Sequence, residues 1–326
     1  MKYLTNNFFQ NLITKKEFTV TVLIIILFLL LIFSNDIFLS KSNIDSLQTS
    51  IAPKAIIAAG MMILLITGVF DLSVGSVMGL AGVITSLCLV KGISVGLSIM
   101  IGLLTGMGFG FFNGILVAIV GVNPLITTIG TMYMGRSLIN ILLEGSARHG
   151  IRGFSQSFIA IGANKTFGLY NMVWIMLIIV IVMQIIITKT TWGKKIYYFG
   201  GNPEAAKIIG INTKKIRIIT YAFSGLLAAL AGILVTARFE MASRVLGSGL
   251  ELNIIIICFI GGGSMAGGRG SVIGALLGCI FMSLVQNSFT ILQISDFWQS
   301  ITIGSLLILV VTSDAYFQMR DTKEVL

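Results

Sequence analysis

The chain has 326 residues, of which 56% are hydrophobic and only 10% are charged, and its mean hydropathy is +1.00. A soluble domain has about 25% charged residues, so this composition excludes an ordinary soluble protein. The net charge of +10 does not indicate nucleic-acid binding, because the basic residues lie between apolar runs without interleaved aromatic residues. We therefore expect one membrane domain over residues 1–326, embedded in a lipid bilayer.

Uncharged apolar runs alternate with short polar gaps along almost the whole chain. A helix needs ~20 mostly apolar residues to cross a hydrocarbon core of roughly 30 Å. The run 92–135 is long enough for two helices with a turn near 121–124. The sequence thus predicts an all-α, polytopic membrane protein with about ten transmembrane helices, roughly over 18–34, 52–69, 73–90, 95–120, 123–142, 168–188, 217–237, 251–263, 271–290 and 298–313.

The distribution of basic residues predicts the orientation, because cytoplasmic loops of membrane proteins are enriched in Lys and Arg. The segment 189–217 carries Lys189, Lys194, Lys195, Lys207, Lys214, Lys215 and Arg217 and should face the cytoplasm. With about ten spans, both termini then lie in the cytoplasm. The expected outer loops are 35–51, 91–94, 143–167, 238–250 and 291–297.

The cytoplasmic segment contains the start and stop signals of a short helix. Asn202 suits the N-cap, and Pro203 suits the first helical position. Glu204 favours the positively polarised N-terminus of a helix, and Lys207 lies toward the other end. Gly210 is placed to end the helix in a left-handed turn.

We therefore expect a helix over Pro203–Ile209 on the cytoplasmic face. Its small residues Ala205 and Ala206 would leave a smooth surface that another protein could grip. A surface helix without a partner is the alternative.

Glycines at spacings of four residues predict close helix packing. Residues at i and i+4 share one face of a helix, so such glycines form a stripe without side chains against which another helix can lie. The stripe comprises Gly102, Gly106, Gly110 and Gly114, and the pairs Gly75/Gly79 and Gly274/Gly278 repeat the spacing. A substrate pathway along the stripe is the alternative.

Three polar residues within or next to the apolar runs are candidates for a translocation path. Asp71 opens a predicted span and is either a helix cap or a pathway residue, since charges inside membranes usually face a cavity. Asn113 and Asn287 lie deep in apolar runs and either link helices by hydrogen bonds or line a polar path. Arg136, Glu144, Glu251 and Asp296 lie near span ends and can extend toward water.

No motif for catalysis, a cofactor or a metal is present. The chain has no G-x-x-x-x-G-K-[ST] phosphate-binding loop and is therefore not an ATPase itself. The segment 261–266 matches a loose dinucleotide pattern but lacks the acidic residue that should follow, so it is interpreted as a turn. His149 has no catalytic or metal partners, and Cys88, Cys258 and Cys279 are interpreted as small apolar residues.

Four blocks resemble the inner-membrane permeases of ribose and simple-sugar class bacterial ABC importers. They occur in the family's order and comprise Gly68–Ser76, Asn123–Met132, Gly200–Ala206 with Gly210 and Ile211, and Glu251–Asn253 with Gly261–Ser271 and Asn287. One departure is the run of four isoleucines after Asn253, where the family has small residues.

The resemblance implies a pore subunit, not an enzyme, in the bacterial inner membrane. It also implies a second, similar permease subunit, a cytoplasmic ABC ATPase that holds ATP and Mg, and an extracytoplasmic sugar-binding protein. The resemblance implies no cofactor on this chain. It implies a coupling segment that docks on the ATPase and comprises Gly200, Gly201, Asn202, Pro203, Glu204, Ala205, Ala206 and Gly210.

Two other classes are considered. An ion-coupled secondary transporter of a small polar solute would place a carboxylate in mid-span, and Asp71 is the nearest candidate. An intramembrane enzyme would need a nucleophile and a base, which the lone His149 does not provide. A neutral sugar needs hydrogen-bonding groups along its path, and the Ser, Thr and Asn residues scattered through the spans fit that need.

Overall fold

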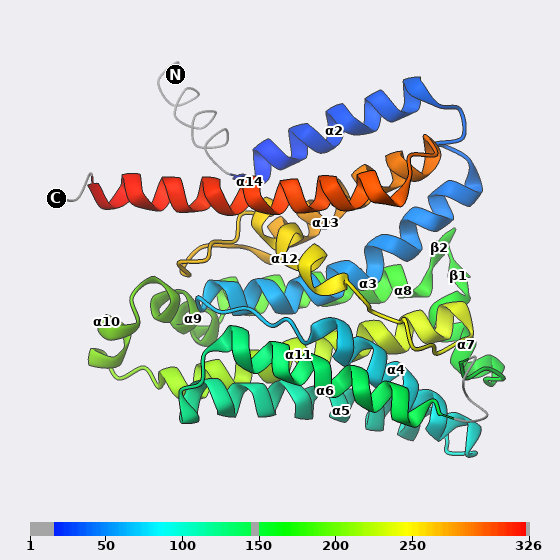
Figure 1. Cartoon of the computed structure of the whole chain (residues 1–326), viewed down its shortest axis with the longest axis horizontal. Coiled ribbons are helices and arrows are strands. Elements are labelled where there is room, and N and C mark those ends of the chain that lie inside the picture. Colours follow the sequence, from blue (N-terminus) through cyan, green and yellow to red (C-terminus); the bar gives the residue numbers. More distant parts are fainter. Residues whose placement is uncertain (1–15, 145–149, 324–326) are drawn as a thin grey trace.

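The computed structural model describes residues 16–144 and 150–323. The described chain is mainly helical, and its long helices run in roughly one direction, horizontally in Figure 1. Each expected apolar run coincides with a helix: α2 (Lys16–Ser34), α3 (Lys41–Ile66), α4 (Val74–Val90), α5 (Val95–Ile115) with the π-helical turn η1 (Leu116–Val120), α6 (Pro124–Leu142), α8 (Asn171–Lys189), α11 (Thr213–Phe239), α12 (Leu250–Ile260), α13 (Val272–Ile291) and α14 (Asp296–Lys323).

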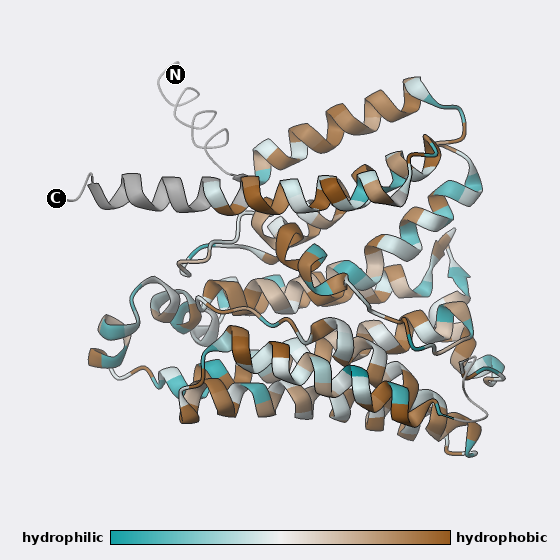
Figure 2. Cartoon of the chain, in the orientation of Figure 1, coloured by the Kyte–Doolittle hydropathy of each residue, from teal (hydrophilic) through white to brown (hydrophobic). Residues whose placement is uncertain are grey.

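The connections carry shorter elements at the two ends of the molecule. α9 (Thr191–Gly201) and α10 (Pro203–Ile208) lie at one end, where α2 begins and α14 ends; we call this the α10 end (Figure 1). α7 (Gln156–Ala163) and the antiparallel strands β1 (Lys165–Thr166) and β2 (Leu169–Tyr170) mark the opposite, hairpin end. Polar residues gather at both ends, and the helices between them are mainly hydrophobic (Figure 2).

The prediction of a polytopic helical membrane protein is confirmed. Within 16–144 and 150–323, six helices are long and apolar enough to cross a bilayer: α2, α3, α5 with η1, α8, α11 and α13. Three further apolar helices are shorter, namely α4, α12 and residues 297–309 of α14. At 1.5 Å per residue, the 11 residues of α12 span only about 16 Å, which is about half of a roughly 30 Å hydrocarbon core.

Helices α3 and α11 form the centre of the bundle. Buried residues make up 78% of the apolar window of α3 and 72% of that of α11, compared with 11% for α2. α11 packs against α3, α4 and α5, and α13 packs against α2, α3 and α12. α3 and α11 are therefore internal, whereas α2 presents most of its apolar surface to the surroundings.

Both central helices are followed by a break and a shorter helix. α3 runs toward the α10 end, residues 67–73 leave the helix, and α4 then runs back (Figure 1). α11 runs in the opposite direction and is followed by residues 240–249 and α12 (Figure 1). Thr67, Asp71 and Ser73 are buried in the first break. Irregular backbone at membrane depth is tolerated only where protein or a cavity covers it, and such broken helices are a feature of transporters.

The glycine stripe packs against a neighbouring helix, as predicted. Gly102, Gly106, Gly110 and Gly114 are buried along α5. A Cβ atom added at Gly106 would collide with the Gly225 carbonyl oxygen of α11, and one added at Gly110 would collide with the Tyr221 carbonyl oxygen. The two backbones are therefore in direct contact, and the stripe leaves no room for a substrate pathway at these two residues.

Two expected outer loops contain regular structure instead. The prediction that the loop extends to residue 51 was wrong, because α3 already begins at Lys41. The Ser40 hydroxyl caps this helix start by accepting a hydrogen bond from the Asn43 nitrogen at 3.3 Å. Its polar first turns pack against α13, which no local pattern reveals. The segment 143–167, expected as an outer loop, contains α7 and β1, and its location outside stays a prediction.

The hairpin is fastened to the start of α3. Lys165 donates to both carboxylate oxygens of Asp45 at 2.6 Å, and these hydrogen bonds raise the pKa of Lys165. The pair is partly exposed, so it holds the hairpin in place without contributing much free energy.

Candidate functional site

The segment 200–210 adopts the predicted helix to within one residue. The Asn202 side chain accepts a hydrogen bond from the Ala205 nitrogen at 2.9 Å, and Pro203 occupies the first turn of α10. Glu204 and Lys207 form an exposed ion pair at 2.9 Å. Gly210 has φ +79°, and its nitrogen donates to the Lys207 carbonyl, so the helix ends in the expected left-handed turn.

The exposed face of α10 differs from the expected one. Ala205 is exposed, but Ala206 is only 1% exposed and packs into the core of the chain, so it was wrongly included in the smooth surface. The missed residues are Ile208 and Ile209, which are 86% and 66% exposed. A usable signal was present in the sequence, because both isoleucines lie in a polar segment, at the end of a short capped helix and just before Gly210.

The base of this segment touches the end of α3 and the glycine-rich turn between α12 and α13. A Cβ atom added at Gly200 would collide with the Ile66 carbonyl oxygen at the end of α3 and would lie 2.6 Å from the Gly268 nitrogen. The Gly268 nitrogen in turn donates to the Ile66 carbonyl at 2.8 Å. The Tyr197 hydroxyl donates to the Gly270 carbonyl at 2.7 Å. A movement of α9 would therefore act on the end of α3 and on the turn before α13. Gly201, by contrast, faces open space.

Asp71 and Asn113 lie in one buried cluster. The Asp71 carboxylate accepts hydrogen bonds from the Ser73 nitrogen at 2.7 Å and from the Ser73 hydroxyl at 2.5 Å. The Asn113 amide donates to the Ser73 hydroxyl at 3.0 Å and so ties α5 to the first break. One oxygen of Asp71 and the Asn113 carbonyl oxygen are buried without a hydrogen-bond partner among the described residues. The cluster organises the start of α4; its place on a path remains a prediction.

Asn287 lies apart from that cluster. It exchanges hydrogen bonds with Asn43 of α3, at 2.6 Å and 3.2 Å. Nearby, the Lys54 ammonium donates to Gln286 at 2.6 Å and to Ser50 at 2.9 Å. Lys54 of α3 thus links its own helix to α13.

A further charged pair lies at the start of α12. Arg136 was expected near a span end but donates to the Leu246 carbonyl at 2.7 Å in the break before α12. One Arg136 nitrogen and one Glu251 oxygen are buried and form no hydrogen bond within the part of the chain that the structure describes, and both lie near Gly75. The Arg136 guanidinium of α6 and the Glu251 carboxylate of α12 therefore both point toward Gly75 of α4.

The remaining candidates add no chemistry. His149 lies outside the described residues. Cys258 and Cys279 are buried and unpaired, and Cys88 is partly buried, in agreement with their interpretation as small apolar residues. Across 16–144 and 150–323 there is no group of three or more His, Cys, Asp or Glu side chains that could hold a metal ion.

Comparisons with known proteins identify the family. The profile of the family described as "Branched-chain amino acid transport system / permease component" matches residues 43–311. The chain is 34% identical over 321 residues to the ribose import permease protein of Haemophilus influenzae, covering 97% of this chain and 98% of that protein. It is 31% identical over 310 residues to the autoinducer 2 import system permease protein of Photorhabdus laumondii, covering 95% and 92%.

The chain is also 32% identical over 319 residues to the galactose/methyl galactoside import permease protein of Escherichia coli K12, covering 92% of this chain and 94% of that protein. No solved structure matches. The broken membrane helices, the capped α10 and the family match agree with one another, and the chain belongs to this family of transport-system permease components.

Proposed function

We propose that this chain is the permease subunit of a binding-protein-dependent ABC importer for a monosaccharide, such as ribose, or a sugar-like solute. The observation that carries the proposal is α10, a capped helix at one end of the bundle that exposes Ala205 and Ile208. The permease names of the relatives support the class of solute. ATP and Mg would be bound by a separate cytoplasmic ABC ATPase, because this chain has no phosphate-binding loop.

The same proposal includes the remaining partners and the topology. A second permease subunit, the same or similar, would complete the pore, and an extracytoplasmic sugar-binding protein would deliver the solute. We propose ten crossings of the bacterial inner membrane, with both termini and the α10 end in the cytoplasm. The start of α2, the end of α14 and the basic segment all at one end support this arrangement.

Labelling with a thiol reagent tests the orientation. In a variant without Cys88, Cys258 and Cys279, we introduce Lys207→Cys on α10 or, for comparison, Ser157→Cys on α7; both positions are exposed. An impermeant reagent added to intact cells should label position 157 and leave position 207 unlabelled until the cells are opened. Labelling of position 207 in intact cells would reverse the orientation.

Reconstitution tests the function. Proteoliposomes that contain the chain with its ATPase, and that are supplied with the binding protein, should take up labelled D-ribose or D-galactose when ATP is present on the α10 side. They should not take up either sugar when ATP is withheld. Uptake that proceeds equally without ATP would contradict the proposed function.

A further inference from the structure

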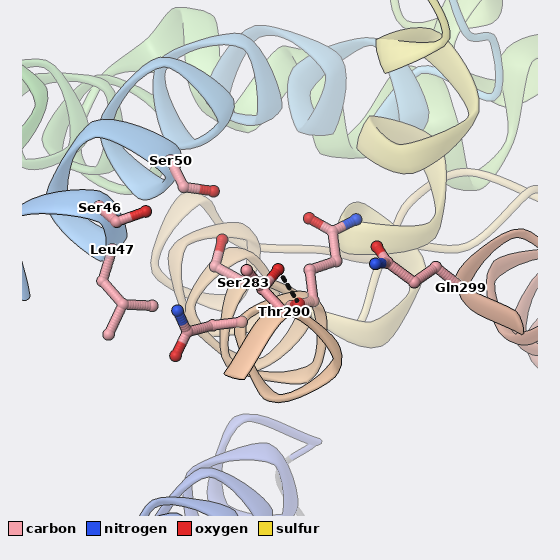
Figure 3. A pocket seen from close by; sticks show the side chains of 8 residues that line it. Ser46, Leu47, Ser50, Ser283, Thr290 and Gln299 are labelled. Atoms are coloured by element: carbon pink, nitrogen blue, oxygen red, sulfur yellow. Dashed lines mark hydrogen bonds between the residues drawn. The ribbon is translucent and has the colours of Figure 1, made fainter. Parts of the chain in front are cut away.

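A polar cavity lies among α3, α13 and α14 at the hairpin end. Its volume is about 350 Å³, within the range of ~300–1,000 Å³ typical of ligand pockets. Figure 3 shows side chains from all three helices around it. Its lining is mainly hydroxyl and amide groups, contributed by Ser46, Ser50, Ser283, Gln286, Asn287 and Thr290, with Leu47 and Gln299 beside them. Such a polar lining is not expected of a crevice that merely holds lipid tails.

A buried hydroxyl in this cavity lacks a strong protein partner. Ser283 is 1% exposed, and no nitrogen or oxygen of a described residue forms a hydrogen bond with its hydroxyl; the Cys279 thiol, a weak hydrogen-bonding group, lies next to it. Thr290, one lining hydroxyl, instead donates to the carbonyl of Gln286 at 3.2 Å within its own helix (Figure 3). Burying a hydroxyl without a hydrogen bond is costly, so Ser283 offers a place for a hydroxyl group of a ligand.

A lysine behind the lining sets the charge of the cavity. The Lys54 ammonium donates to Ser50 and Gln286, both of which line the cavity, and it forms no ion pair with a described carboxylate. The other end of the Gln286 amide donates to Asn253 of α12 at 3.2 Å. Gln286 is thereby held by two neighbouring helices. Ionisable groups inside membrane proteins are rare and mark solute paths. The positive charge favours ligands with acceptor oxygens.

We infer that this cavity is an outer binding site for a neutral polyhydroxylated solute, reached before the solute crosses the bundle. The inference rests on the proposed function, which places the hairpin end outside. Hydroxyl and amide groups can donate to and accept from the hydroxyls of a sugar. The lining itself holds no charged side chain, so the direct contacts with a ligand are made by neutral hydroxyl and amide groups. Asn287 would act here through its pair with Asn43.

Protection from a thiol reagent tests binding at this cavity. In the complete importer built on the variant without native cysteines, Ser46→Cys lies on the lining at an exposed position. Ser42→Cys lies on the same helix, is also exposed and is not part of the lining. The sugar that the importer transports, D-ribose or D-galactose, is added at about ten times its dissociation constant for the cavity. Labelling of position 46 should then slow about tenfold, because only about one site in eleven is free. Labelling of position 42 should not change.

Filling the cavity tests its role in transport. Ser283→Leu places a larger apolar side chain in the space, whereas Ser288→Leu changes a neighbouring hydroxyl of α13 that bonds to its own helix at Val285. We expect sugar uptake to fall at least about tenfold in the first variant only, with the ATPase still bound in both. If Ser283→Leu fails to assemble, the protection assay decides alone.

The outcomes separate the two levels of the proposal. If the unmodified importer takes up neither D-ribose nor D-galactose, the proposed sugar function fails. If it takes up the sugar while position 46 is unprotected, this cavity is not the site and the proposed function stands. Protection by a sugar phosphate but not by a neutral sugar would overturn the assignment of a neutral solute.

Discussion

Replacement of Gly106 by leucine should prevent α5 and α11 from packing and so destabilise the whole bundle. A Cβ atom added at Gly106 would collide with the Gly225 carbonyl oxygen and would lie 2.5 Å from the Ala229 Cβ atom. Both neighbours belong to α11, one of the two most buried helices. Inserting a side chain into a packed interior typically costs 1–3 kcal/mol, and a leucine between two backbones should cost about 3 kcal/mol or more.

Gly108 on the same helix provides a matched control. A Cβ atom at Gly108 would meet nothing within 4 Å, so Gly108→Leu makes the same change without the collision. The measurement is the apparent unfolding temperature of each purified variant in detergent, together with its yield from membranes. Gly106→Leu should lower both the unfolding temperature and the yield, and Gly108→Leu should resemble the unchanged protein. Equal stability of the two variants would show that α5 and α11 are not in backbone contact.

A negative charge at position 205 should separate the permease from its ATPase. Ala205 is exposed in the isolated chain, so Ala205→Glu should fold and reach the membrane normally. In the complex, the small side chain would lie against the partner, where an unpaired charge is strongly unfavourable. Ile208→Asp should act in the same way, because a large apolar residue that is 86% exposed is suited to anchor an interface, and its loss should cost about 2 kcal/mol or more of binding.

The assay is co-purification of the ATPase with each variant, alongside uptake of the labelled sugar. Ser157→Glu introduces the same charge at an exposed small residue of α7, at the opposite end of the molecule, and should leave both readouts unchanged. Normal co-purification with normal uptake in Ala205→Glu would remove α10 from the mechanism.

Transmission through α9 can be separated from docking. Gly200→Ala would push α9 away from the Ile66 carbonyl oxygen, whereas Gly201→Ala meets nothing within 4 Å. We expect Gly200→Ala to retain the ATPase but to lose uptake, and Gly201→Ala to retain both. Normal uptake in Gly200→Ala would mean that the contact with α3 carries no movement.

Local signals in the sequence predicted the elements well. Each apolar run produced a helix because length and hydropathy act within one segment. The limits of α10 followed from Asn202, Pro203 and Gly210, whose side chains or backbone angles act on adjacent residues. The glycine stripe was predictable for the same reason, since its spacing defines one face of a helix.

Features that depend on neighbouring helices were not predictable. Nothing local distinguishes buried Ala206 from exposed Ala205, because the difference arises when α10 packs against the bundle. The early start of α3 depends on α13, which holds Asn43 through Asn287. Lys54 beside an apolar run was a usable signal for the polar cavity, but its partner Gln286 is 232 residues away.

Uptake of a labelled sugar into proteoliposomes that contain the chain with or without its ATPase tests whether a separate ATPase drives transport. We expect uptake only when the ATPase, ATP and the sugar-binding protein are all present, because the energy must enter through α10. Uptake that persists without the ATPase and follows an ion gradient would instead identify the chain as a secondary transporter.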